Sequence, residues 1–93
     1  MEPRYGGTFT AHLRQTPGTG GWTFAPVPEA FAPRVTHAWG RTPVRATVDG
    51  VTWETSVWRD TKSGETLLAV PKRVRGAKGH GDPVRVTLAF SAL

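Results

Sequence analysis

Alternation of apolar and polar residues runs along most of the chain and constrains its fold more than any other feature. Apolar or small residues occupy every second position in four runs, within residues 5–13, 44–48, 51–57 and 84–90. A period of two is typical of β-strands that bury one face and expose the other. Two shorter apolar runs, at 22–24 and 67–70, predict two further strands. The sequence therefore predicts a mainly β domain of six strands.

The segments between these runs have the chemistry of turns and short helices. Asp49-Gly50 separates two alternating runs, and this pair suits the positive φ angles of a type I′ hairpin turn. Residues 16–21 and 61–65 contain the Gly, Pro and Ser that mark hairpin loops. Residues 28–32 and 71–75 each begin with Pro, which is tolerated at the first position of a helix. We expect one short helix at each of these two places.

The two halves of the chain repeat one order: strand, loop, strand, Val-Pro, short helix, strand. A unit of about half this length can hardly bury its hydrophobic face alone. We therefore expect two ββαβ copies, at about residues 5–48 and 49–90, to close one sheet into a compact six-stranded barrel with the helices over its open ends. The matches are Thr8-Phe9 and Leu13 with Thr52-Trp53 and Val57, Val27-Pro28 and Phe31 with Val70-Pro71 and Val74, and Thr42–Val48 with Asp82–Leu88; their offsets are 44, 43 and 40.

The composition fits one small domain and excludes several kinds of site. The 93 residues include no Cys, which excludes disulfides, a thiolate nucleophile and a Cys-ligated zinc site. The three His residues are too scattered for a helical metal motif, so we expect neither a metal nor a cofactor. The N-terminus lacks a secretory signal, and no stretch approaches the roughly 18 apolar residues of a membrane span. We therefore expect a single cytoplasmic domain over residues 1–93, without a membrane contact.

The net charge of +5 is concentrated in one segment. Residues 72–85 hold five Lys and Arg against one Asp, a local charge of +4. Glycines lie among them, and Gly-rich turns present backbone N–H groups to anions. We take Lys72, Arg73, Arg75 and Lys78 as candidates for binding an anionic small molecule or protein partner. The alternative is a solvated helix face that keeps the barrel soluble.

Nucleic acid is a further possible partner, bound through charge alone. We do not favour it, because no aromatic residue interleaves with the basic run, and so base stacking is not indicated. Two tryptophans outside the predicted core are the other binding candidates, because Trp is enriched in binding hot spots. Trp58 follows the inward Val57 and is expected to point outward, and Trp39 lies in the irregular segment 36–41.

His12 and Glu54 are the candidate catalytic residues of an alternative reading as a small enzyme. The alternation places both on outward strand faces. With the opposite phase they would point into the barrel and form an acid–base pair. Such an enzyme, a cyclase or isomerase, would use a Trp-lined barrel pocket. We favour a non-enzymatic binding or accessory barrel, monomeric or weakly dimeric.

Three stretches of the chain resemble the DUF1905 family. They are residues 22–28, residues 44–57 and the stretch LAVPKRVRGAKGHGDPVRVTL at 68–88, and together the resemblance covers roughly residues 7–90. Its most specific part is Gly81-Asp82 with Val84 after a basic short helix. The resemblance implies a small bacterial or archaeal double-split β-barrel, of the YdeI/OmpD-associated type, and no general activity. Pro71 directly before the basic helix, Trp39 and Trp58 depart from the family pattern.

Overall fold

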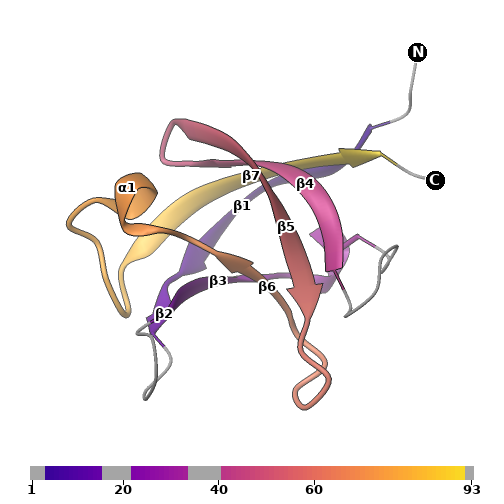
Figure 1. The fold of residues 1–93 in the computed structure, drawn as a ribbon, viewed down its shortest axis with the longest axis horizontal. Helices are drawn as coiled ribbons and strands as arrows, with labels where there is room; N and C mark the ends of the chain where they lie inside the picture. Colours follow the sequence, from indigo (N-terminus) through magenta and orange to yellow (C-terminus); the bar gives the residue numbers. More distant parts are fainter. Residues whose placement is uncertain (1–3, 16–21, 34–40, 92–93) are drawn as a thin grey trace.

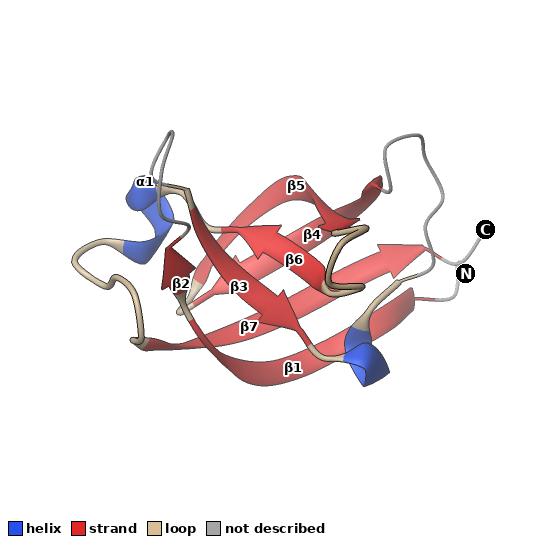
Figure 2. Ribbon diagram, turned by 90° about the horizontal axis from the view of Figure 1, so that it is seen from below, coloured by secondary structure: helices blue, strands red, loops and turns tan. Residues whose placement is uncertain are grey.

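The computed structural model describes residues 4–15, 22–33 and 41–91, and these ranges form one curled β-sheet with two short helical segments (Figures 1 and 2). The mainly β class predicted from the alternation is confirmed. The elements in chain order are β1 (Arg4–His12), β2 (Arg14–Gln15), β3 (Thr23–Val27), η1 (Glu29–Phe31), β4 (Arg41–Val48), β5 (Val51–Arg59), β6 (Thr66–Ala69), α1 (Lys72–Arg75) and β7 (Pro83–Ser91).

The sheet closes through its first strand. Its strands are hydrogen-bonded in the order β1-β7-β4-β5-β6-β3-β2, and all neighbours in this order are antiparallel. β1 and β2 stand at opposite ends of this order, yet only Leu13 separates them in the sequence. The single run from Arg4 to Gln15 therefore pairs with β7 and then with β3, and brings the two ends of the sheet together. Seven strands are counted where six were expected because the chain continues past Leu13, the end of the predicted first strand, into the two-residue strand β2.

The loop before β7 contacts the chain at Leu13. The Leu13 N–H donates to the carbonyl of Asp82 at 2.9 Å, and the Gly81 N–H donates to the carbonyl of Leu13 at 2.7 Å. Two residues further, the Gln15 N–H donates to Nδ1 of His80 at 2.9 Å. The Gly81-Asp82 pair, the most specific part of the resemblance, thus fixes the point where the first strand changes partner.

Two prolines explain why β1 and β3 separate. The Val70 N–H donates to the carbonyl of Thr23 at 2.9 Å, so the backbone polar groups of Thr23 face β6. Because these groups alternate along a strand, Pro26 and Pro28 stand toward β1, where they offer no N–H. The ladder between β2 and β3 accordingly has two residue pairs, Arg14 with Phe24 and Gln15 with Thr23, and the strands diverge beyond it.

The core lies inside the curl and consists of inward residues of the alternating runs, joined by Ala25 and Val27 of β3, Leu68 and Val70 at β6, and Val74 of α1. Phe9 belongs to it as expected, and Trp53 and Phe90 pack against it while partly exposed. Phe31 of η1 covers it at one end and stacks on Phe9 with 5.2 Å between the ring centroids. A Cβ on Gly7 would lie 2.6 Å from the Phe31 ring, so Gly7 provides the space for this contact. The largest fully buried side chains among the described residues are Leu13, Val48, Val57, Leu68, Val70, Val84, Val86 and Leu88.

The predicted turns and helices agree with the structure wherever it describes them. Asp49 and Gly50 have φ of 46° and 89° and join β4 to β5, with Val48 paired to Val51. Residues 61–65 connect the antiparallel β5 and β6. Both predicted helices follow a proline N-cap, although the first is a single 3-10 turn and α1 has four residues. The predicted loop at 16–21 lies outside the described residues.

We expect Leu13→Ala to be among the most damaging core substitutions, since Leu13 is fully buried where the first strand changes partner. Buried Leu→Ala changes cost about 2–5 kcal/mol. Leu67→Ala, on a half-buried outward side chain of β6, is the matched control and should cost clearly less. Urea unfolding of the two variants measures both values. Equal losses would contradict the importance assigned to the Leu13 junction.

Candidate functional site

Lys72 and Arg73 of α1 project into solvent. α1 begins after Pro71 and ends at Gly76, whose φ of 60° stops the helix. Val74 is buried and anchors the helix on the core, while Lys72 and Arg73 are exposed. Neither side chain has an ion pair within the described residues. These two predicted anion-binding residues therefore keep their charge available to a partner.

Lys78 and Arg75, the other two basic candidates, contact the protein itself. The Lys78 Nζ donates to Oδ2 of Asp49 at 2.7 Å and to the carbonyl of Pro83 at 2.7 Å. An Nη of Arg75 donates to the carbonyl of Lys78 at 3.1 Å, and the Arg75 Nε is buried without a partner among the described residues. These contacts tie the loop after α1 to the β4–β5 turn, 29 residues away in sequence.

Asp49 is a charged residue that the sequence indicated only as part of a turn. Its carboxylate accepts hydrogen bonds from the Lys78 ammonium and from the Arg85 N–H, the latter at 2.9 Å. The Lys78 hydrogen bond is the larger cause, and both lower the pKa of Asp49 below its ordinary value of 3.8. Asp49 therefore neutralises one cation of the basic segment.

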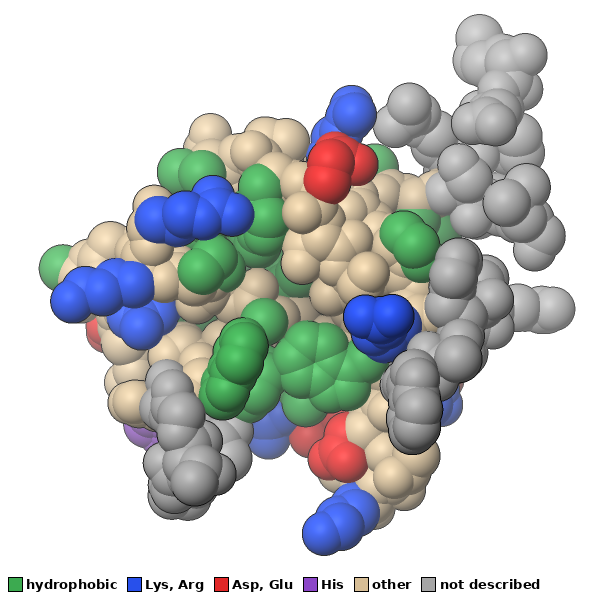
Figure 3. Space-filling view, in the orientation of Figure 1, with side chains coloured by type: hydrophobic (Ala, Val, Ile, Leu, Met, Phe, Trp, Pro, Cys, Tyr) green, Lys and Arg blue, Asp and Glu red, His purple; other side chains and the backbone are tan. Residues whose placement is uncertain are grey.

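An apolar surface covers the outward side of β3 and β6 and the adjoining end of β5 at Trp58. Trp58 is half-buried and points outward as expected, and its ring meets Phe24 edge-on with 5.2 Å between centroids and 79° between planes. Trp22 is 61% exposed. Figure 3 shows hydrophobic side chains gathered on this side of the molecule, with Lys and Arg at the margin. We call this surface the aromatic face; its members are Trp22, Phe24, Pro26, Trp58, Leu67 and Ala69.

Sequence reasoning selected Trp58 for this face but missed Trp22 and Phe24. The sequence predicts a short strand at residues 22–24, and the spacing of two between Trp22 and Phe24 places both rings on one side of that strand. What the sequence did not provide was the pairing of Phe24 with Ala69 and of Trp58 with Leu67, which brings the two rings together. Trp39, the other predicted binding tryptophan, lies outside the described residues.

Cations flank the aromatic face. Arg41 is directly opposite Trp58 in the β4–β5 ladder, is exposed, and has no ion pair within the described residues. Arg14 is opposite Phe24 and pairs with Glu65 at 2.8 Å. The bond between Thr23 and Val70 brings Trp22 close to α1, and Figure 1 places α1 and the start of β4 on opposite sides of β3 and β6.

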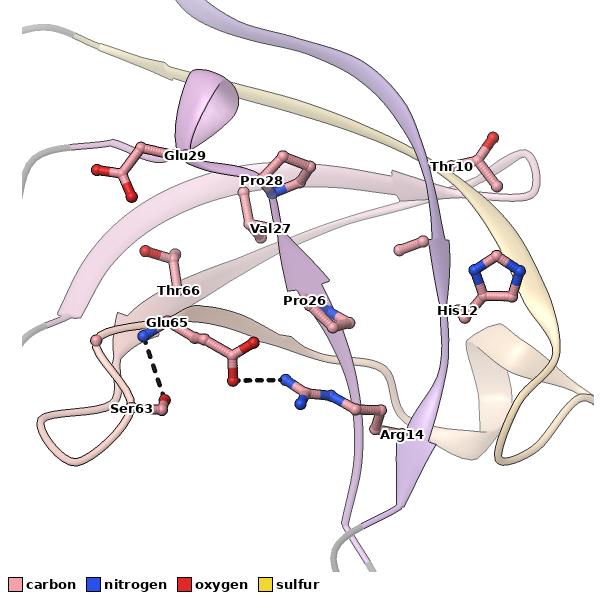
Figure 4. A pocket seen from close by; sticks show the side chains of 12 residues that line it. Thr10, His12, Arg14, Pro26, Val27, Pro28, Glu29, Ser63, Glu65 and Thr66 are labelled. Carbon is pink, nitrogen blue, oxygen red and sulfur yellow. Dashed lines mark hydrogen bonds and ion pairs between the residues drawn. The ribbon is translucent and has the colours of Figure 1, made fainter.

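An open cleft of about 670 Å³ lies where β1 and β3 separate (Figure 4). The Arg14–Glu65 ion pair lies in it, and the Ser63 hydroxyl accepts the Glu65 N–H at 3.2 Å. No Trp is among its described lining residues, in contrast to the pocket expected for a small enzyme. The lining residues are Thr10, Ala11, His12, Arg14, Pro26, Val27, Pro28, Glu29, Ser63, Gly64, Glu65 and Thr66.

The structure does not bring His12 and Glu54 together. His12 is exposed on β1 and lines the cleft, whereas Glu54 is exposed on β5, with β7 and β4 lying between these strands. The Arg45 Nε donates to Glu54 Oε2 at 2.6 Å, and this hydrogen bond raises the pKa of Arg45.

Among the residues described, no group of three His, Asp or Glu is placed to hold a metal ion. In the same residues no helix has the length and apolar character to cross a membrane.

We expect Asp49→Asn to lower the melting temperature at pH 7, because it removes the carboxylate that Lys78 and the Arg85 N–H contact. Asn tolerates the positive φ at this turn. Since folding lowers the pKa of Asp49, its charge stabilises the protein fully above the ordinary pKa of 3.8 and ceases to do so as the pH falls through the folded pKa. The gap between wild type and variant should therefore shrink in acid.

Thermal unfolding from pH 7 to about pH 2, below the ordinary carboxylate range, measures this gap. Glu29→Gln, on an exposed carboxylate of η1, is the control and should follow the wild type throughout. A gap that stays constant with pH would mean that the Asp49 charge is not what stabilises the turn.

The comparisons with known proteins identify a family and no activity. Among curated proteins no match is found. A family model described as a domain of unknown function, DUF1905, matches residues 9–88. The match runs from the middle of β1 to near the end of β7 and thus includes the strand that closes the sheet, the aromatic face and α1. The chain belongs to the DUF1905 family.

Proposed function

We propose that this domain is a small binding module that contacts an anionic partner through Lys72 and Arg73 of α1. The observation that carries the proposal is that both side chains are exposed and have no ion pair within the described residues. Lys78 lies in the same segment and is neutralised by Asp49. The basic segment thus contains cations that stabilise the fold and cations that do not.

The distribution of carboxylates supports this proposal. Asp49, Glu54 and Glu65 form ion pairs with Lys78, Arg45 and Arg14. Asp60 accepts the Lys62 N–H and the Ser63 hydroxyl, which lower its pKa, and Asp82 accepts the Gly79 N–H. The described carboxylates other than Glu29 therefore already have a partner, and the cations of α1 meet no opposing charge.

The two helical segments provide a second argument. We propose that the barrel is an internal duplication, because the repeat offsets also relate its strand pairs. Residues 11 and 84 pair between β1 and β7. The offset of 44 takes residue 11 to residue 55, and the offset of 40 takes residue 84 back to residue 44. Residues 55 and 44 pair between β5 and β4. On this alignment η1 carries Glu29 and Ala30 where α1 carries Lys72 and Arg73. The barrel therefore does not need positive charge at this position.

We expect the double variant Lys72→Glu with Arg73→Glu to lose affinity for a polyanion while its melting temperature hardly changes. Immobilised heparin is the probe, and the NaCl concentration at elution is the measurement. Contacts between cations and an anionic chain release counterions, so the wild type should elute at clearly higher salt than the variant.

The matched control is Arg59→Glu with Lys62→Glu, which makes the same change in net charge at two exposed sites of the β5–β6 hairpin, outside the basic segment. It should elute close to the wild type. If both double variants elute at the same salt concentration, charge alone governs retention and the assignment to α1 is wrong. Arg75→Glu is avoided because Arg75 contacts the Lys78 carbonyl.

A further inference from the structure

We infer that the aromatic face binds single-stranded nucleic acid, with bases stacked on Trp22 and Trp58 and phosphates contacting Arg41, Lys72 and Arg73. This inference rests on the proposed function, because the same α1 cations contact the anionic chain. It adds the chemical class of the partner and a second set of contacts. It also revises the expectation that base stacking is not indicated.

The expectation that bases do not stack here depended only on residues adjacent to the basic run in the sequence. The basic run contains no aromatic residue, but the fold brings Trp22 of the β3 segment next to it. The Val70 N–H bonds to the Thr23 carbonyl, so the residue before Thr23 lies beside the residue after Val70, which is Pro71. Lys72 follows directly. The backbone thus places Trp22 next to the start of α1, which carries the free cations.

Two rings of the aromatic face, Phe24 and Trp58, hold each other in place, and Trp22 is open to solvent. Trp22 is 61% exposed, and Phe24 and Trp58 are half-buried. Phe24 pairs with Ala69 and Trp58 with Leu67, and the small side chain of Ala69 lets the two rings meet edge-on across β6. Stacking on bases requires aromatic surface that is open to solvent, which Trp22 supplies, and it is favoured by a fixed orientation, which the contact with Phe24 gives Trp58.

The charges around the face fit a phosphate chain. Arg41 lies opposite Trp58, and Lys72 and Arg73 lie beyond Trp22, so unpaired cations stand on two sides of the rings. Glu65 borders the face but is paired with Arg14. The members of the face itself include no acidic residue. A backbone crossing from α1 toward the start of β4 meets cations at both ends and rings between them.

The aromatic surface favours single strands over the other anionic partners. A duplex keeps its bases paired and stacked inside, so the rings would have nothing to stack on. An acidic protein segment would use the cations but would gain little from flat aromatic surface. A single strand uses both features, because each base offers a π-face and each phosphate a charge.

The experiment compares two fluorescein-labelled oligomers by anisotropy: oligothymidylate of about 12 nucleotides, within the site sizes of small single-strand-binding domains, and an abasic oligomer of equal length. We expect the wild type to bind oligothymidylate at least about fivefold more tightly than the abasic chain. Trp22→Ala and Trp58→Leu should each remove most of this difference and leave abasic binding unchanged. Val51→Ala, an exposed apolar residue at the β4–β5 hairpin, is the control and should keep the difference.

The outcomes separate this inference from the proposed function. Equal affinity for the two oligomers, both weakened by Lys72→Glu with Arg73→Glu, would retain α1 as an anion site and overturn base stacking. No binding of either oligomer by the wild type would overturn the inference whatever the heparin result. Displacement of oligothymidylate by polyglutamate at equal charge concentration would identify an acidic protein segment as the partner and also overturn it. Trp22 is exposed, so its variant reports binding even if Trp58→Leu unfolds.

Discussion

The fold depends on one strand that pairs at both ends of the sheet. The run from Arg4 to Gln15 follows β7 through most of its length and then pairs with β3. Without this change of partner, β3 would present an unpaired edge to another chain. The change requires an interruption of the ladder, and the backbone bonds between Leu13 and residues 81–82 supply it. The loop between α1 and β7 is thereby held to the first strand at the point of closure.

This constraint explains how the cations of the basic segment divide. The loop after α1 must reach both the first strand and the β4–β5 turn, and Lys78 holds it at the turn through Asp49. Arg75 supports the same loop through the Lys78 carbonyl. Lys72 and Arg73 precede these contacts on α1, where the buried Val74 already fixes the helix. Among the described residues, closure of the sheet therefore leaves the charges of Lys72 and Arg73 without an ion pair.

Local patterns predicted most of the strands, most of the inward residues and the Asp49-Gly50 turn, because each depends on neighbours in the sequence. Val51 is an exception: it begins an alternating run but is exposed next to the turn. The change of partner at Leu13 was not predicted, since the alternating run ends there and nothing in Arg14 and Gln15 indicates that they pair with β3. The Lys78–Asp49 pair joins residues 29 positions apart. The meeting of Phe24 with Trp58 depends on the registers of β3 and β5 against β6. Such contacts follow from tertiary pairing, which the spacing of residues does not encode.

The aromatic face is the part of the fold that closure does not explain. Burying apolar surface stabilises a protein by about 25 cal/mol per Å², so rings left on the outer face of a small barrel forgo stabilisation. The outward positions of β1 and β7 show that this sheet accommodates polar residues, since Thr8 and Thr87 lie there and bond to each other. The inside of the barrel already holds a complete core from both halves. Clustered, fixed rings beside unpaired cations are thus better explained by a partner that covers them than by the needs of folding.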